Sequence, residues 1–317
     1  MNNYITACLI VKDEEKNLEK CLISIRHLCS QIVVVDTGSS DKTSTIASRY
    51  GCEIYFKKWN NDFAEARNFA ISHARNDWIL SIDADEYIKN FEIDKTILNN
   101  DNIGGINLNI INYLDDKVNG PISEHRYTRL FRNNQKIKFE GKIHEQIRLS
   151  IESLSLDIVD SDLIIYHTGY VNTSIEKRER NRDLLENAVK ENNEDWNVYH
   201  LAESQFALKN NGEAKSLYSQ ILNSKELNID QIEKAKIRLG QIALDEENYI
   251  EVESLLDFKA SDKNLEGFRI FVLAAAQINN KKYREAKNLY FSKEITESNL
   301  VDKEIVNKAK SVLEQFK

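Results

Sequence analysis

The chain has 317 residues, of which 41% are hydrophobic, and a formal net charge of -8. This length allows a sizeable core and two domains, and the acidic balance argues against generalised nucleic-acid binding, which needs basic surface to displace counterions, although a local basic groove stays open. The apolar runs fall short of the roughly 20 residues that span a bilayer, and no basic segment precedes the apolar N-terminal stretch. We therefore expect a cytoplasmic protein without an integral membrane segment.

Short β-type runs alternate with helical runs in the first 172 residues. In chain order they are ITACLIV, EEKNLEKCLISIRHL, QIVVVD, TSTIASRYG, CEIYF, DFAEARNFAISHA and WILSIDAD. Such alternation predicts βαβ units and a mostly parallel sheet covered by helices. We expect a Rossmann-like α/β domain at residues 1–172.

Helical periodicity dominates the chain beyond residue 175. Small residues recur at 38 and then 34 residues, and each precedes a second marked position by 12 residues. These pairs are Ala202 and Ala214, Gly240 and Val252, and Ala274 and Ala286. The pattern is typical of tetratricopeptide repeats, in which small residues lie where two helices cross closely. We expect a connecting helix at 173–195 and three degenerate repeats at 196–317, with an irregular helical bundle as the alternative.

Acidic residues stand where the predicted parallel strands end. Lys12-Asp13-Glu14 follows CLIV, Asp36 ends IVVVD, and Asp83 ends WILSID. Ligands bind beyond the carboxyl ends of parallel strands, so these are candidate binding residues. Asp36 can contact a nucleotide or can cap the turn TGSSDKT. The sequence contains neither GxGxxG nor GxxxxGK[ST], which argues against dinucleotide and P-loop chemistry.

Asp83 and Asp85 form a D-x-D motif directly after an apolar strand. Two such carboxylates suit a hard divalent cation, whose remaining ligands are often substrate phosphate oxygens. The motif therefore predicts Mn²⁺ or Mg²⁺, which would neutralise the charge on a departing nucleoside diphosphate. An acidic surface triplet is the alternative.

Longer segments resemble a known family. ITACLIVKDEEKNLEKCLISI, IVVVDTGSSDKT, DFAEARNFAI and WILSIDADE resemble the inverting glycosyltransferases of family 2, which have the GT-A fold. YTRLFRN, IKFEGKIHEQI and IIYHTGY resemble a bacterial branch with C-terminal tetratricopeptide repeats, which includes the sublancin-type peptide S-glycosyltransferases. The resemblance implies transfer of a hexose from a UDP-sugar to Cys, Ser or Thr of a peptide or protein. Transfer to lipid-linked or cell-surface glycans is one alternative, and a peptide-binding scaffold with an inactive sugar-nucleotide domain is another.

The resemblance also implies nucleotide-binding residues. Val11, Glu14 and Asp36 would line the nucleoside pocket, and Asp83 would contact the nucleotide sugar as well as the metal. Arg67 would approach the diphosphate, because a planar guanidinium donates several hydrogen bonds at once. The alternative for Arg67 is a solvated ion pair with a nearby acidic residue.

Glu145 and His144 are the catalytic candidates by motif match. In an inverting transferase a carboxylate accepts the proton of the acceptor, which is the role implied for Glu145. The alternative pairs Glu145 with Lys142 or Arg148 and lets His144 pack. His167 is either a late metal ligand, as imidazole often is, or a buried structural histidine.

The repeats favour a peptide over a lipid as the acceptor, because tetratricopeptide surfaces cradle extended or helical peptides. They also allow a homo-oligomer. The identity of the sugar, the acceptor atom and the oligomeric state are not specified by the sequence.

Overall fold

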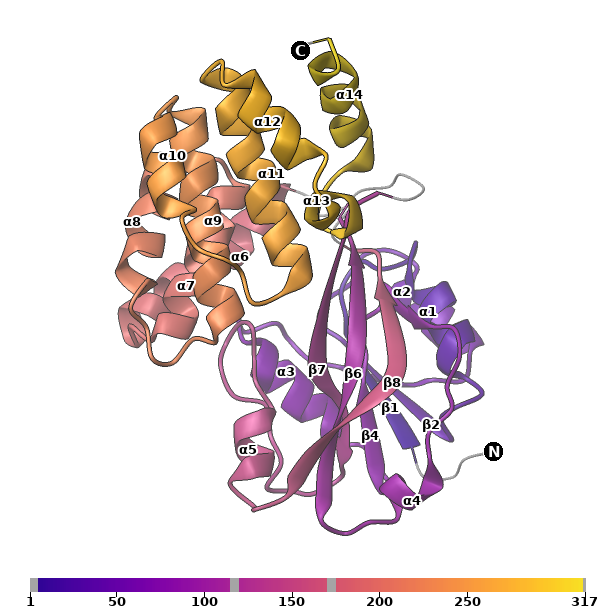
Figure 1. The fold of residues 1–317 in the computed structure, drawn as a ribbon. Helices are drawn as coiled ribbons and strands as arrows, with labels where there is room; N and C mark the ends of the chain where they lie inside the picture. The colour runs from indigo at the N-terminus through magenta and orange to yellow at the C-terminus, as the bar shows by residue number, and fades with distance from the viewer. Residues whose placement is uncertain (1–4, 115–119, 170–174, 316–317) are drawn as a thin grey trace. The chain divides into compact units, whose positions relative to one another are not determined.

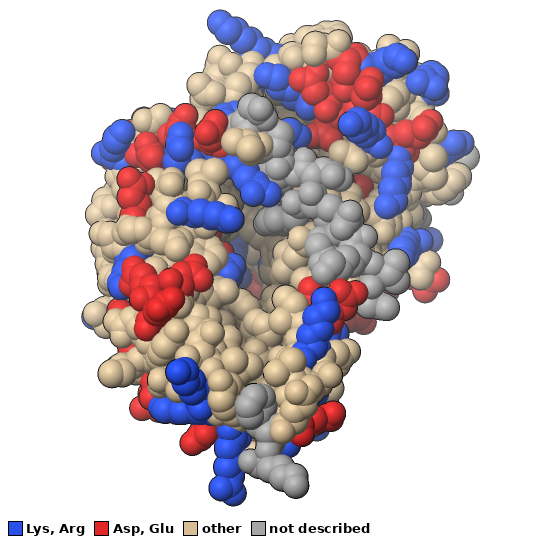
Figure 2. Space-filling model, turned by 90° about the horizontal axis from the view of Figure 1, so that it is seen from above, with Lys and Arg blue, Asp and Glu red and all other residues tan. Residues whose placement is uncertain are grey.

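The computed structural model describes residues 5–114, 120–169 and 175–315 (Figure 1). Contacts divide the chain into two compact units, Met1–Leu114 with Glu124–Asn172, and Asp115–Ser123 with Thr173–Lys317. No helix in the described ranges combines the length and apolar character needed to cross a membrane. On the face shown in Figure 2, basic and acidic side chains are interspersed, and the described residues form no extended basic area there.

The first unit is built on an eight-stranded sheet with the order β3-β2-β1-β4-β7-β6-β8-β5. β1 pairs in parallel with β2 and β4, β2 with β3, and β6 with β8, while β4–β7 and β5–β8 are antiparallel. The predicted mostly parallel sheet is confirmed. The strands are β1 (Ile5–Val11), β2 (Gln31–Asp36), β3 (Glu53–Phe56), β4 (Trp78–Ser81), β5 (Glu86–Ile88), β6 (Ile103–Tyr113), β7 (Ile122–Arg132) and β8 (Asp157–His167).

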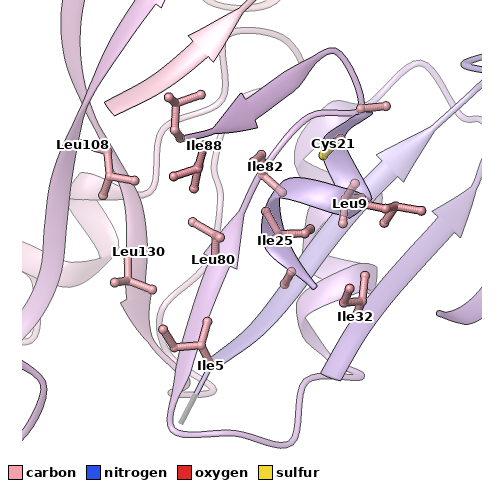
Figure 3. Close-up of a cluster of buried hydrophobic side chains, with 14 of the residues drawn as sticks. Ile5, Leu9, Cys21, Ile25, Ile32, Leu80, Ile82, Ile88, Leu108 and Leu130 are labelled. Atoms are coloured by element: carbon pink, nitrogen blue, oxygen red, sulfur yellow. The ribbon is translucent and has the colours of Figure 1, made fainter. Parts of the chain in front are cut away.

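Helices cover both faces of this sheet. Along β1, Ile5 and Leu9 belong to the same buried cluster as Ile25 of α1 (Figure 3). Cys8 points to the opposite face and belongs to a second cluster, which includes residues of α3. Strands buried on both faces read as continuous apolar runs, which places the polar residues at the strand ends. The helices are α1 (Leu18–Ile25), α2 (Thr43–Arg49), α3 (Phe63–Ile71), α4 (Lys95–Leu98) and α5 (Arg148–Glu152).

The described part of the second unit from residue 175 onward is helical, and its helices pack in consecutive pairs, as predicted. The six marked small or apolar positions lie on α7 to α12, and Ala202, Ala214, Val252, Ala274 and Ala286 are all fully buried. A Cβ at Gly240 would lie 3.0 Å from the side chain of Leu256, the residue that follows the paired helix. The helices are α6 (Ile175–Glu191), α7 (Asp195–Ala207), α8 (Asn211–Ile221), α9 (Ile229–Asp245), α10 (Tyr249–Leu255), α11 (Lys263–Asn279), α12 (Tyr283–Tyr290), α13 (Lys293–Glu297) and α14 (Lys303–Leu313).

The turns inside the three helix pairs share one geometry. Lys209, Glu247 and Lys281 each adopt a positive φ, of 63°, 57° and 61°. The next residue of each turn donates its N–H to a carbonyl five positions earlier, at 2.9 Å in all three turns. This is the left-handed helix cap that usually contains Gly. The repetition of one cap supports an array of helical repeats over an irregular bundle.

Candidate active site

The carboxyl ends of β1, β2 and β4 lie next to one another in the sheet, since β1 pairs in parallel with both neighbours. Val11 is the last residue of β1. It is 3% exposed, and its side chain packs in the hydrophobic core beneath the sheet end where the candidate site residues lie. Asp36 lies opposite Val11 in the register. The predicted nucleoside-pocket residues Val11 and Asp36 are therefore neighbours at the end of the sheet.

Asp36 is buried and organises the turn that follows β2. Its Oδ1 accepts the N–H groups of Gly38 at 2.9 Å and Ser39 at 2.7 Å, and its Oδ2 accepts the hydroxyl of Ser44. Burial opposes ionisation, but these hydrogen bonds outweigh it and lower the pKa of Asp36. The turn-capping alternative is thus observed. A role in nucleotide binding stays a prediction.

Glu14 lies in the loop after β1, and this loop is tied to the loop after β2. The N–H of Glu14 donates to Thr43 Oγ1 at 2.8 Å, and its carboxylate accepts from Asn17 at 2.8 Å. Asp13 accepts the N–H of Ser40 at 2.7 Å. These hydrogen bonds hold the two strand-end segments together, and the role of Glu14 in nucleoside binding stays a prediction.

Arg67 joins two of the predicted site residues. It lies on α3, is 8% exposed, and donates through Nη2 to Asp83 Oδ1 at 2.8 Å and through Nε to Glu145. Nη1 donates to Ser81 at 3.2 Å. Burial opposes ionisation of Asp83, but Arg67 and Arg129 outweigh it and hold the pKa of Asp83 well below its ordinary value. The network therefore keeps a charged carboxylate at the end of β4.

The solvated ion pair considered for Arg67 and the Arg148 partner considered for Glu145 are not observed. The Lys142 partner considered for Glu145 stays a prediction. Glu65 pairs with Lys57 at 2.8 Å, and Asp62 caps α3 by accepting the N–H of Glu65 at 2.7 Å. Arg148 pairs instead with Glu152, one turn along α5, at 2.6 Å. Both candidate residues are therefore directed into the site by partners far away in the sequence.

The loop that carries Glu145 is fastened to the sheet and to α3. Gln146 and Glu140 exchange two backbone hydrogen bonds of 2.8 Å, which close the turn. The Tyr127 hydroxyl on β7 donates to the carbonyl of Glu145 at 2.5 Å. His144 has a φ of 51° and lies beside Glu145 in this loop. The residue is exposed overall, but neighbouring atoms desolvate its imidazole and lower its pKa although Glu145 opposes the shift. Its catalytic role and the packing alternative both stay predictions.

Asn68 makes the link from α3 to this loop. Its side-chain amide donates to the carbonyl of Phe139 and accepts the N–H of Phe139, both at 2.9 Å. In the sequence Asn68 directly follows Arg67. One turn of α3 therefore supplies both the guanidinium that contacts Glu145 and the amide that holds the backbone of Phe139, ahead of the Glu145 loop. The "ARN" segment positions the site through two adjacent residues.

Two site residues were missed by sequence reasoning. Glu86, on β5, is 1% exposed and accepts the Asp83 N–H at 2.8 Å and Arg129 Nη2 at 2.7 Å. Burial raises the pKa of Glu86 although Arg129 opposes the shift. Arg129 comes from β7 within the segment YTRLFRN, and its Nε is buried with no hydrogen-bond partner among the described residues. The sequence signals for them were a third carboxylate directly after D-x-D and an arginine between the buried positions Thr128 and Leu130 of the segment YTRLFRN.

Asp85 and His167 form a second pair next to this network. His167 Nε2 lies 3.4 Å from Asp85 Oδ2, and both side chains are about one-fifth exposed, at 20% and 22%. A Cβ at Gly169 would lie 1.9 Å from that Oδ2 and 2.7 Å from that Nε2, so only glycine leaves room there. The structure thus brings Asp85 and His167 together, whereas the oxygens of Asp83 face arginines.

The charges of the cluster fit a divalent cation. Its carboxylates outnumber its guanidinium groups by two: the carboxylates are Asp83, Asp85, Glu86 and Glu145, and the guanidinium groups are Arg67 and Arg129. Burial opposes protonation of His167, but Asp85 and the other carboxylates outweigh it and raise its pKa, so the cluster attracts positive charge. Among the described residues, no group of three His, Cys, Asp or Glu side chains is arranged to hold a metal. The ligand roles predicted for Asp83, Asp85 and His167 therefore stay predictions.

Comparison with known proteins identifies the first unit. Residues 6–149 match the family model Glycosyl transferase family 2. These residues form a glycosyltransferase family 2 domain. All the predicted site residues except His167 lie inside the matched segment of this family 2 domain, and together with the sheet described above the match confirms the predicted GT-A fold.

Two relatives extend beyond the family 2 domain. The SPbeta prophage-derived glycosyltransferase SunS of Bacillus subtilis is 31% identical over 264 residues, which are 80% of this chain and 62% of that protein. A TPR repeat-containing protein of Synechococcus elongatus is 31% identical over 200 residues, which are 60% of this chain and 49% of that protein. The chain therefore spans about half to three-fifths of the length of these relatives.

Solved structures show only distant likeness. S. aureus TarS 1-349 in complex with UDP-GlcNAc is 17% identical, covers 89% of this chain and 92% of its own, and has a TM-score of 0.41. Glucosyl-3-phosphoglycerate synthase from Mycobacterium tuberculosis is 17% identical over 58% of this chain and 80% of its own, with a TM-score of 0.42. At these TM-scores neither likeness supports a conclusion about this chain.

Proposed function

We propose that the protein is a metal-dependent, inverting glycosyltransferase that moves a hexose from a UDP-sugar to a side chain of a peptide or protein. The observation that carries this proposal is the buried arginine network, in which Arg67 holds Asp83 and Glu145 at the end of the parallel strands. Desolvating these charged groups is costly, and the network lies at the carboxyl ends of parallel strands, where such sheets bind ligands, so we assign it a task in the reaction.

The proposed reaction assigns a task to each part of the site. Arg67 would exchange part of its carboxylate contacts for the diphosphate, whose oxygens suit the planar guanidinium. Asp85 and His167 would hold Mn²⁺ or Mg²⁺, which supplies Lewis-acid stabilisation of the departing UDP. Glu145 would accept the proton of the acceptor as its oxygen or sulfur bonds to the anomeric carbon and the bond from that carbon to the diphosphate breaks.

The acceptor class rests on the second unit and on the relatives. An array of helical repeats offers a surface suited to an extended or helical peptide. SunS, a glycosyltransferase by name, is similar over 80% of this chain, which includes part of the repeats. The similarity to SunS supports glycosyl transfer, and the helical repeats are what favours a peptide or protein acceptor over a lipid-linked glycan.

The donor can be found by incubating the protein with Mn²⁺ and a panel of UDP-sugars and measuring UDP release, followed by mass spectrometry of candidate acceptor peptides. We expect one UDP-hexose to be consumed and Asp85→Ala to abolish metal-dependent transfer while the circular dichroism spectrum stays unchanged. Full activity of that variant with metal would exclude Asp85 as a ligand. If no UDP-sugar is consumed, the result would contradict the proposed transferase and favour a peptide-binding scaffold with an inactive sugar-nucleotide domain.

A further inference from the structure

Asn112 is a buried polar residue at a position where the sequence pattern calls for an apolar one. On β6 the inward-facing residues before it are Ile106, Leu108 and Ile110, all at most 1% exposed, and Asn112 continues the same alternation at 2%. Burying an amide is costly unless its hydrogen bonds are made. Asn112 therefore has to be explained by what its amide binds.

The amide of Asn112 connects two histidines. Its Oδ1 lies 2.8 Å from Nδ1 of His167, and its Nδ2 lies 3.1 Å from Nδ1 of His125. The donor Nδ2 faces His125, so Oδ1 is left to accept a hydrogen from His167. The opposite ring nitrogen of His167, Nε2, faces Asp85.

We infer that Asn112 is a positioning residue that fixes His167 as the Nδ1-protonated tautomer and thereby keeps Nε2 as a metal ligand. The inference rests on the proposed function, because it assigns Asn112 a task in the proposed metal site. A neutral imidazole carries one hydrogen, and holding it on Nδ1 leaves the lone pair on Nε2. If Nε2 carried the hydrogen, it would donate to Asp85 and close the site to a cation. Partners behind a ligating histidine commonly set its tautomer in this way.

Metal affinity tests the inference without relying on turnover. Mn²⁺ binding to the full-length chain, with UDP present, is measured from the electron paramagnetic resonance signal of free Mn²⁺. We expect Asn112→Leu to weaken Mn²⁺ binding about 10- to 100-fold, the usual effect of losing such a partner. Asn112→Asp keeps an acceptor for the Nδ1 hydrogen and should bind within a few-fold of wild type, as rescue by a conservative change requires.

Asn107→Leu is the matched control. Asn107 lies on the same strand and makes two side-chain hydrogen bonds, with Asp160 at 2.9 Å and Thr128 at 2.7 Å, away from the site. This variant should bind Mn²⁺ like wild type. Equal Mn²⁺ binding by wild type and Asn112→Leu would overturn the inference and leave the proposed function standing. Wild-type protein that binds no Mn²⁺ with UDP would overturn both.

Histidine ¹⁵N NMR of the wild-type chain gives a second readout that does not depend on how the leucine variant folds. The spectra are recorded above the pKa that the same ¹⁵N titration gives for His167, because the neighbouring carboxylates raise this pKa, and the tautomer of the neutral ring is then read from its nitrogens. We expect the hydrogen of His167 on Nδ1. A hydrogen on Nε2 would overturn the inference.

Discussion

At the scale of single residues, Arg67 organises the candidate site. It is buried and contacts carboxylates that come from a strand end and from a separate loop, 16 and 78 residues away in the sequence. Removing one partner of such a buried pair leaves an uncompensated charge, which is far more costly than losing a surface pair. The sequence alone could name Arg67 and Glu145 as candidates, but only the fold shows that they touch.

Glu145→Gln tests the proposed base. A general base contributes roughly 10²- to 10⁴-fold, so we expect kcat to fall by that factor while UDP affinity stays near wild type, because Asp83 and Ser81 still hold Arg67. Steady-state rates and UDP titrations on the same sample measure both. Glu140→Gln, on the exposed side of the same loop, is the control and should leave kcat unchanged. Weak UDP binding with an unchanged rate per bound donor would make Glu145 a binding residue instead.

Glu203 in the second unit gives a prediction about pH. It accepts from Lys234 at 2.7 Å and Arg238 at 3.1 Å, and although burial opposes its ionisation, these cations lower its pKa. A lowered carboxyl pKa stabilises the fold above the ordinary value of about 4.3, and this stability is lost as pH falls toward the lowered value. We expect Glu203→Gln to reduce the free energy of unfolding by about 1–3 kcal/mol at neutral pH.

The difference between wild type and Glu203→Gln should shrink as the pH falls below about 4, measured by urea denaturation at each pH. Glu297→Gln is the control, because Glu297 forms an exposed pair with Lys293 at 3.6 Å and such pairs contribute little. A difference that stays constant from neutral to acid pH would show that Glu203 acts through packing rather than charge.

At the scale of elements, close helix crossings depend on individual glycines. A Cβ at Gly267 of α11 would lie 2.3 Å from the carbonyl oxygen of Glu294 and 2.4 Å from Ser298 Cβ. A backbone carbonyl cannot move aside, so we expect Gly267→Ala to destabilise the protein by about 1–3 kcal/mol or more. At Gly240 the nearest atom is a Leu256 side-chain carbon at 3.0 Å, which can shift.

Gly240→Ala is therefore the matched comparison for Gly267→Ala. The better helix propensity of alanine, worth about 1 kcal/mol, offsets the mild crowding at Gly240, so this variant should stay close to wild type. Both free energies of unfolding are measured in urea. Equal effects of the two substitutions would contradict the close α11–α13 crossing.

The sequence predicts a feature of these elements well when residues close to it in the chain determine that feature, and poorly when distant partners determine it. The small residues at helix crossings follow a spacing that the sequence shows directly, and all were confirmed as buried or closely packed. The left-handed turn residues inside the helix pairs could not be predicted, because Lys209, Glu247 and Lys281 stand where such a cap usually has glycine. Asn112 was missed because its partners come from other strands, although a polar residue ending an apolar alternation was visible.

At the scale of the whole molecule, we propose that the first unit binds the donor and carries out the transfer, and that the second unit binds the acceptor. The site residues from Val11 to Gly169 all belong to the first unit, and the helix pairs belong to the second. Asp115–Ser123 groups with the second unit, so the division is not a single cut in the chain. The boundaries at residues 172 and 195 stay predictions, and a shortened chain is the direct way to separate donor chemistry from acceptor recognition.

A chain ending at residue 172 should bind UDP but lose turnover on the true acceptor. It keeps the buried network around Arg67 and the Asp85–His167 pair, so donor binding and slow hydrolysis of the UDP-sugar by water are expected to persist. It lacks the repeats, which we propose to bind the acceptor. UDP titration, UDP-sugar hydrolysis and acceptor turnover are measured beside the full-length chain, with hydrolysis serving as the internal control for folding. If the shortened chain modifies the acceptor at the full-length rate, acceptor recognition resides in the family 2 domain and the repeats have another task.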